Sequence, residues 1–160
     1  MAELFKSSED LANKVYKAIE DAGLASYGIP VEVMSTTKSK HPMSVSMAGS
    51  KAEYLTNTSG MICVELYEKA LEMIEDSQVD MVIEMFINGI SYNSEKDKIQ
   101  LQTNQLINLF DLYRKYGNTF MNAIEAAYHA IRQIEEDEKT EKEANKAEKK
   151  AKRQGNNEMD

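Results

Sequence analysis

The chain has 160 residues, of which 42% are hydrophobic, so it is long enough for one domain with a core and too short for two ordinary domains. The formal net charge of −8 disfavours a general nucleic-acid binder, because most of such a surface repels phosphate groups. The single cysteine, Cys63, excludes an intrachain disulfide, and no apolar stretch approaches the roughly 18 residues of a membrane span. The first residues also lack the apolar run of a signal peptide, so we expect a cytoplasmic protein without a membrane partner.

The first predicted element is a helix over residues 8–22. Its apolar residues recur at three- and four-residue spacing, as on one buried helix face. Ser7 or Ser8 is expected to cap its beginning, and Gly23 is expected to end it.

Three strands are predicted to follow this helix. Alternating or continuous apolar runs place them at residues 29–35, 43–48 and 61–67. The third run is almost entirely apolar, which predicts a central position in the sheet. Residues 36–42 are expected to form a polar loop, and residues 49–60 a connection with weak local preference.

Two helices and a hairpin are predicted next. Residues 68–76 should form a short helix, and residues 77–88 a longer one with Ser77 as its cap and Asp80 completing a capping box. Residues 90–93 and 98–102 have the pattern of a hairpin joined by a polar turn.

Helices are expected to complete the chain. The apolar pattern predicts one over residues 104–116, a break at Gly117-Asn118, and a last helix from Thr119 onward. From residue 135 the apolar stripe stops, so we divide the chain into a domain at 1–133 and a charged helical or disordered tail at 134–160.

The charges of the tail separate along the sequence. Acidic residues come first, and a basic run follows, made of Lys146, Lys149, Lys150, Lys152 and Arg153. Such a run is typical either of a nucleic-acid contact or of a solvated helix end. We favour a solvated extension of the last helix, with pairs such as Glu138 and Lys142 at four-residue spacing and fraying after Gln154.

The predicted fold class is therefore α+β, with a small mixed sheet packed by helices and a long charged C-terminal helix. The order of three stretches is similar to that of a family of phage-encoded metallopeptidases with a minimal zincin-like fold. The stretches are residues 49–56 with the strand 61–66, the helix 77–88, and residues 106–117, which end in Arg-x-Tyr-Gly. The resemblance covers residues 8–132 and implies a zincin-like arrangement.

That family's zinc chemistry requires His-Glu-x-x-His on a helix, where two imidazoles bind the metal and the glutamate acts as general base. When Glu84 is aligned with this base, Ile83 and Ile87 fall at the ligand positions. A shift of two residues places Met85 and Gly89 there, with Phe86 at the base. Neither alignment supplies an imidazole, so the resemblance implies a degenerate member with no metal and no cofactor.

Single residues also have ordinary structural interpretations. Glu84 is expected to face solvent or to accept a hydrogen bond from a nearby donor, and it is catalytic only if the chain is an active enzyme. Cys63 lies in an apolar run and is expected to be a buried thiol. His41 and His129 are expected to be surface or partly packed histidines.

The leading functional hypothesis is a non-catalytic, phage-encoded pseudo-metallopeptidase that acts by binding a protein, and a basic partner suits its charge. Metallopeptidases hold substrate as an added strand along a sheet edge, and a protein without the metal can keep that groove for a partner peptide. The candidate edges are the strand 43–48 and the loop 36–42. The candidate partner-binding residues are Met43, Val45, Met47, Glu84 and Tyr92.

Two alternatives remain open at this point. The first is a metal-dependent peptidase with non-standard ligands, for which His41, His129, Cys63 and carboxylates must converge. The second is a virion or assembly protein that forms homo-oligomers through its C-terminal helix. A phage origin implies the host cytoplasm or the virion as the location.

Overall fold

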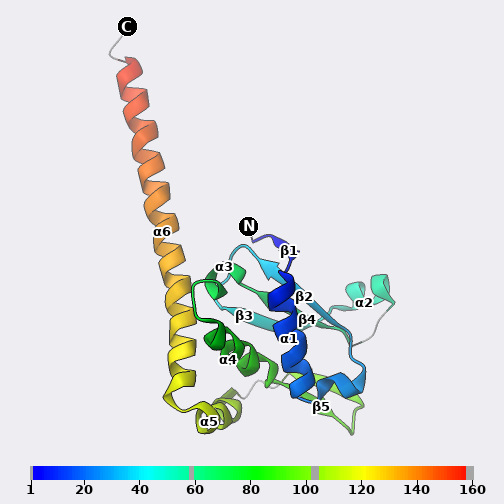
Figure 1. The fold of residues 1–160 in the computed structure, drawn as a ribbon. Coiled ribbons are helices and arrows are strands. Elements are labelled where there is room, and N and C mark those ends of the chain that lie inside the picture. The colour runs from blue at the N-terminus through cyan, green and yellow to red at the C-terminus, as the bar shows by residue number, and fades with distance from the viewer. Residues whose placement is uncertain (1, 58–59, 102–104, 158–160) are drawn as a thin grey trace.

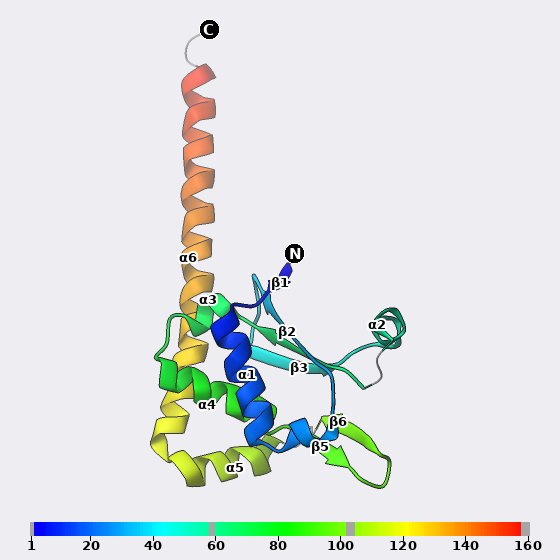
Figure 2. The same ribbon diagram turned by 45° about the vertical axis from the view of Figure 1, so that its right-hand side comes forward.

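Helices cover one face of a four-stranded sheet, and a separate hairpin and a long C-terminal helix complete the fold (Figure 1, Figure 2). The computed structural model describes residues 2–57, 60–101 and 105–157, with the backbone alone described for 105–108 and 152–157. The predicted α+β class with a small mixed sheet is confirmed.

The sheet has the strand order β1-β2-β4-β3. Strand β4 (Ile62–Leu66) lies parallel to β2 (Val31–Thr36) and antiparallel to β3 (Met43–Met47), which forms one edge of the sheet. The central position predicted for the most apolar strand is thus confirmed. The other edge is β1 (Leu4–Lys6), a short exposed strand that pairs antiparallel with β2 and that the sequence did not predict.

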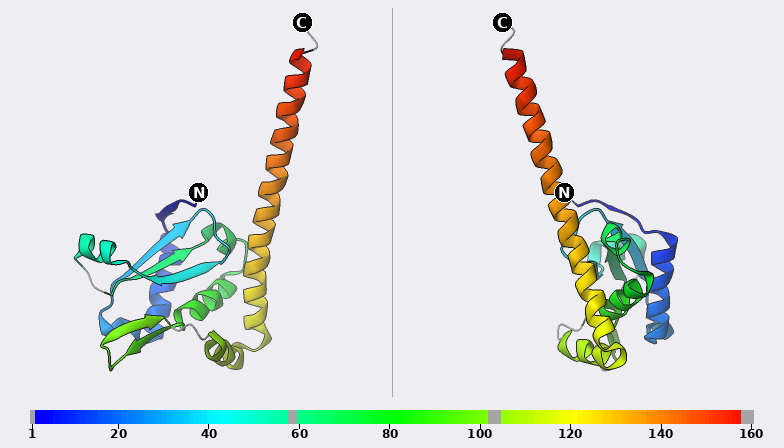
Figure 3. Two further views of the ribbon diagram at one scale, coloured as in Figure 1. Left: turned by 180° about the vertical axis from the view of Figure 1, so that it is seen from behind. Right: turned by 60° about the vertical axis from the view of Figure 1, so that its left-hand side comes forward.

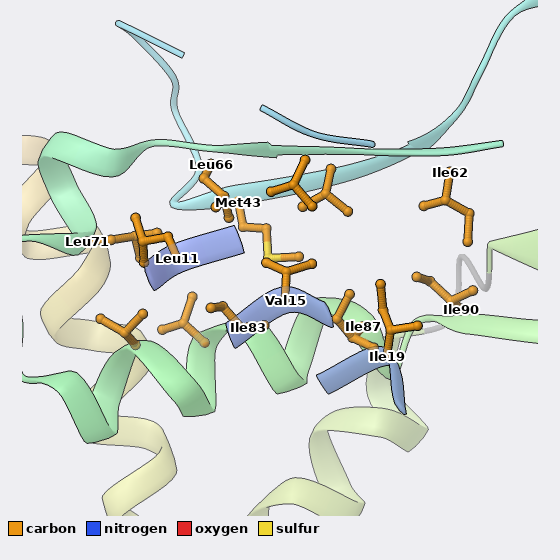
Figure 4. Packing of buried hydrophobic residues seen from close by; sticks show 14 of the residues in the cluster. Leu11, Val15, Ile19, Met43, Ile62, Leu66, Leu71, Ile83, Ile87 and Ile90 are labelled. Carbon is orange, nitrogen blue, oxygen red and sulfur yellow. The ribbon is translucent and has the colours of Figure 1, made fainter. Parts of the chain in front are cut away.

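The core lies between the sheet and two helices, α1 (Glu9–Asp21) and α4 (Asp76–Ile87) (Figure 4). Helix α1 contributes Leu11, Val15 and Ile19, whose four-residue spacing places them on one buried face. Its end at Gly23 is confirmed, because this glycine has a φ of +74°, a left-handed conformation that favours glycine. A 3₁₀ turn, η1 (Leu24–Tyr27), then leads to β2.

The predicted cap of α4 was wrong. The helix begins one residue earlier, and Glu75 is its N-cap: the Glu75 carboxylate accepts a backbone N–H, while the Glu75 N–H donates to Gln78 Oε1 at 3.1 Å. Asp80 has another partner, since Lys14 Nζ of α1 donates to Asp80 Oδ1 at 2.8 Å and to Asp76 Oδ2 at 3.0 Å. The capping box is thus formed by Glu75 and Gln78 instead of Ser77 and Asp80, and Asp80 pairs with α1.

The segments around β4 also differ from the prediction. Residues 49–60 contain a short helix, α2 (Ser50–Thr56), which has no buried residue and stands out from the sheet (Figure 2). Helix α3 (Glu68–Leu71) has only four residues, whereas the sequence pattern predicted a helix to residue 76.

The hairpin β5 (Ile90–Asn93) and β6 (Lys98–Leu101) agrees with the prediction, although residue 102 lies outside the described residues. Helix α5 (Gln105–Tyr116) confirms the next prediction, except for residue 104, which is likewise not described. The break after it is confirmed at Gly117, which has a φ of +60°.

The last helix, α6 (Asn118–Asn157), has 40 residues and packs on α3, α4 and α5 before it leaves the body of the protein (Figure 3). Its last buried residue within the described side chains is Ile134, which contacts the cluster around Tyr67 and Ala70. None of the described helices combines the length and the apolar character of a membrane span.

Candidate functional site

A cleft runs beside the outer edge of β3, and we call it the β3 cleft. One wall is β3 itself, and the other is formed by the end of α4, by β6 and by α5 and α6. The cavity has a volume of about 290 Å³, and most of its lining is apolar. Its lining residues are His41, Met43, Ser44, Val45, Met85, Phe86, Gly89, Leu101, Leu109 and Tyr128.

The backbone of β3 presents free hydrogen-bonding groups at this edge. Tyr67 N donates to Pro42 O at 2.9 Å and Ala48 N donates to Met61 O at 2.8 Å, so the even-numbered residues of β3 pair with β4. In an antiparallel ladder, the backbone N–H and C=O groups of the alternate residues point away from the paired strand. The N–H and C=O groups of Met43, Val45 and Met47 therefore face outward, and no other described strand pairs with them.

A histidine and a tyrosine in the lining of the β3 cleft are bonded to each other. His41 Nδ1 and the Tyr128 hydroxyl lie 3.0 Å apart in a hydrogen bond, and their rings meet edge to face at 6.0 Å between centroids. Burial raises the pKa of Tyr128, so its hydroxyl stays protonated at neutral pH. The pair supplies the cleft with two polar groups that can bond to a bound chain.

Glu84 lies outside this cleft, in a polar groove between α1, α4 and α5. Its carboxylate accepts hydrogen bonds from Lys115 Nζ at 2.7 Å and from the Tyr116 hydroxyl at 2.5 Å. The bond to Glu84 raises the pKa of Lys115, and burial followed by the same carboxylate raises the pKa of Tyr116. Glu84 therefore joins α4 to α5, in agreement with the expectation that it accepts a bond from a nearby donor.

The two zinc-motif alignments fall in different places. Ile83 and Ile87, which the alignment on Glu84 places at the ligand positions, are each 1% exposed in the core. Met85, Phe86 and Gly89, which belong to the shifted alignment, line the β3 cleft. The shifted alignment thus corresponds to the cleft next to the edge strand, but a thioether, a phenyl ring and a glycine do not fit a zinc ion.

The remaining candidate ligands lie far apart on different elements. His129 is exposed on α6 near the start of α4, Cys63 is half-buried on β4, and His41 lies at the β3 cleft. Within the described part of the chain, no three histidine, cysteine or acidic residues gather as a metal site needs. Burial raises the pKa of the Cys63 thiol, and Glu32 and Glu65 raise it further, which opposes a thiolate nucleophile.

The structure brings together only some of the predicted partner-binding residues. Val45 and Met47 are partly buried along β3, and Met43 is 1% exposed, so their side chains contact the core while their backbone faces the edge. Tyr92 lies elsewhere, stacked on Tyr27 with 4.0 Å between the ring centroids and bonded through its hydroxyl to Asp97.

The basic run of the tail lies on the exposed part of α6. The side chains of Lys146, Lys149 and Lys150 are exposed, and those of Lys152 and Arg153 lie outside the described residues. The run is thus separate from both the β3 cleft and the Glu84 groove.

Comparison with protein families, with curated proteins and with solved structures finds no match to this chain.

Proposed function

We propose that this chain is a non-catalytic binding protein, derived from the scaffold of a phage metallopeptidase, that holds an extended segment of a protein partner as an added strand on β3. The observation that carries the proposal is the β3 cleft, because it combines free backbone groups with an apolar cavity at the same sheet edge. Strand addition uses both features: main-chain bonds give affinity, and pockets for alternate side chains give specificity.

The size of the cavity supports a peptide side chain as its occupant. About 290 Å³ lies just below the roughly 300–1,000 Å³ that is usual for small-molecule sites. One or two large apolar side chains fill such a space. An added strand that pairs with Val45 directs every second side chain toward the same face as Val45 and Met43, which is the face of the cleft.

The chemistry of the lining supports binding without catalysis. A peptidase needs a general base and an electrophile beside the scissile bond. The end of α4 brings Met85 and Phe86 to the cleft, and Gly89 follows just after the helix. The carboxylate of Glu84 is bonded to Lys115 and Tyr116 in another groove. His41 is an imidazole in the lining, and its Nδ1 is bonded to the Tyr128 hydroxyl.

The charge of the chain indicates the composition of the partner segment. A formal net charge of −8 attracts basic peptides and repels acidic ones. We therefore expect a segment with one or two large apolar residues in the cleft, flanked by lysine or arginine.

The test is selection of binders from a displayed library of short random peptides, followed by affinity measurement by fluorescence polarisation. Val45→Pro is the key variant, because it removes an outward N–H at the centre of the edge and leaves the bonds to β4 in place. Met85→Glu is the second variant, since it puts a charge into the apolar cavity. We expect each to weaken the selected peptides about tenfold or more, which is about 1.4 kcal/mol.

Ser46→Ala is the matched control, because Ser46 lies on the same strand, is exposed, and pairs through its backbone with β4. We expect it to bind like the unchanged chain, and thermal melts establish that all three variants are folded. Peptides that bind Val45→Pro and Met85→Glu with undiminished affinity, or a selection that enriches no peptide, would contradict the proposal.

A further inference from the structure

The part of α6 beyond the body has little cover from its own chain: its first turns share a small pocket with Lys38, and the residues after them stand clear of the body. We call residues 135–157 the helix extension. All side chains from 139 to 151 are exposed, and the extension points away from the sheet and the other helices in every view (Figure 1, Figure 3). At a rise of about 1.5 Å per residue it is roughly 35 Å long, comparable to the diameter of a small domain.

The charges of the helix extension are divided into two halves of opposite sign. Residues 135–143 contain six acidic and two basic residues, for a net charge of −4. Residues 146–153 contain one acidic and five basic residues, for a net charge of +4. The two halves are equal in magnitude and adjacent along one helix.

This separation is unfavourable within a single helix. Lys149 and Lys150 follow Lys146 at three- and four-residue spacing, and Arg153 follows Lys149 at four, so like charges are neighbours on the helix surface. The helix dipole does not account for the pattern, because its effect is limited to the last turn and Lys146 lies well before Asn157. A partner with the opposite order of charges relieves the repulsion in both halves.

A second copy of this chain has that order when it runs antiparallel. The acidic half of each copy then lies beside the basic half of the other, twice over by the two-fold symmetry. A parallel pair places acidic against acidic and basic against basic, which is unfavourable.

Small residues give the extension a face on which two helices can approach closely. Thr140, Ala144, Ala147 and Ala151 recur at spacings of four, three and four residues, which is the repeat of a helix–helix seam. Antiparallel pairing along this face puts residue 140 opposite 151 and residue 144 opposite 147. In the same register residue 134 lies opposite residue 157, so each copy's extension ends where the body of the other begins.

We propose that two copies of this chain associate through an antiparallel pair of helix extensions, held by the complementary halves 135–143 and 146–153. The pairing is separate from the β3 cleft, because Ile134 is the last buried residue on α6 among the described side chains and the cleft is bordered by Tyr128. Each dimer carries two β3 clefts at opposite ends of a shared rod.

Light scattering on the full-length chain at low ionic strength measures the association directly. The mass is expected to rise with concentration from 18.1 kDa toward twice that value. It is expected to return to the monomer value at about 1 M salt, where the Debye length is only about 3 Å. A mass that stays at the monomer value at low salt, or a dimer that persists unchanged at high salt, overturns the proposal.

Two charge-reversal variants in the full chain test the complementary halves. The first makes both halves basic by changing three glutamates to lysine, at Glu136, Glu141 and Glu143. The second makes both halves acidic by changing three lysines to glutamate, at Lys146, Lys149 and Lys150. We expect each variant alone to stay monomeric and an equimolar mixture to form a heterodimer with the mass of the original dimer. A variant that dimerises alone as the unchanged chain does, or a mixture that stays monomeric, refutes the pairing.

Disulfide trapping tests the orientation in a Cys63→Ser background. Thr140→Cys and Ala151→Cys are made in separate chains, because antiparallel pairing brings these two positions together and keeps each away from its own copy. The mixture is expected to give a crosslinked dimer of the two different chains in severalfold excess over either variant alone. Equal crosslinking of each variant with itself indicates a parallel pair and overturns the antiparallel arrangement.

Discussion

Replacing Ile83 by alanine tests the placement of α4 against the sheet, on which the assignment of the β3 cleft depends. Ile83 is 1% exposed and lies in the cluster with Val15 and Ile87 (Figure 4). Alanine lacks three of its carbon atoms, and their burial is worth roughly 2.4 kcal/mol at about 0.8 kcal/mol each. The cavity left behind, up to roughly 80 Å³, adds up to about 2 kcal/mol at about 24 cal/mol per Å³.

The expected loss in the free energy of unfolding is therefore about 2.5–4.5 kcal/mol. For a chain of this length it corresponds to a fall of about 5–15 °C in Tm. Urea denaturation followed by circular dichroism measures the loss, and Met85→Ala is the control because Met85 is partly exposed at the cleft and should lose only about 1 kcal/mol. A loss below about 1 kcal/mol for Ile83→Ala, or the same loss for both variants, would show that α4 does not direct Ile83 into the core.

Three further predictions concern the cap, the interhelical break and the pH dependence. Glu75→Ala should cost about 1 kcal/mol because it removes the N-cap of α4, whereas Ser77→Ala should change the unfolding midpoint little; equal effects in urea denaturation would contradict the cap. Gly117→Ala should cost about 1 kcal/mol, since its φ of +60° strains any side chain although a Cβ there meets no atom within 4 Å; an unchanged Tm would speak against the left-handed turn. Folding raises the pKa of Tyr116 above its usual 10.0, chiefly by burial, and that of Lys14 above 10.5, chiefly through its bond to Asp80. The folded chain then binds more protons than the unfolded chain at alkaline pH. The contribution of these two groups to the free energy of unfolding is therefore complete below about pH 10 and is lost as the pH rises through their folded pKa values. Urea midpoints at about pH 8 and about pH 11 measure this loss, and equal midpoints would refute it.

The elements that bury an apolar face were predictable from the sequence. Helix α1 carries Leu11, Val15 and Ile19 at regular spacing, and all three are buried. Strand β4 alternates between the fully buried Ile62 and Val64 and the half-buried Cys63, and its apolar run correctly indicated the centre of the sheet. One apolar face produces both the periodic sequence pattern and the burial, so these segments can be predicted from the sequence alone.

The elements that bury little were missed for the same reason. Helix α2 has no buried residue and thus no apolar periodicity. Strand β1 is exposed along its length, and it is held to β2 by pairing across the chain, as in the bond from Glu3 N to Thr37 Oγ1, 34 residues apart. A local pattern contains no information on such a partner.

The candidate site depends almost entirely on contacts between distant segments. His41 and Tyr128 are 87 residues apart in the sequence, and Glu84 and Lys115 are 31 apart. The sequence pattern made β3 a candidate edge and predicted a helix over most of α4. It did not reveal that Met85 and Phe86 border the cleft while Glu84 turns to another groove, because that choice is set by how α4 rotates against the core.

The unequal edges of the sheet limit how the protein can aggregate. A filament that grows by strand addition needs two receptive edges on every subunit, one for each neighbour. Here the edge strand β3 has five residues, whereas the opposite edge strand β1 has three. Strand β1 therefore offers few backbone N–H and C=O groups to an added strand. Strand addition between the four-stranded sheets of two single copies is therefore expected to join β3 to β3 and to stop at a pair.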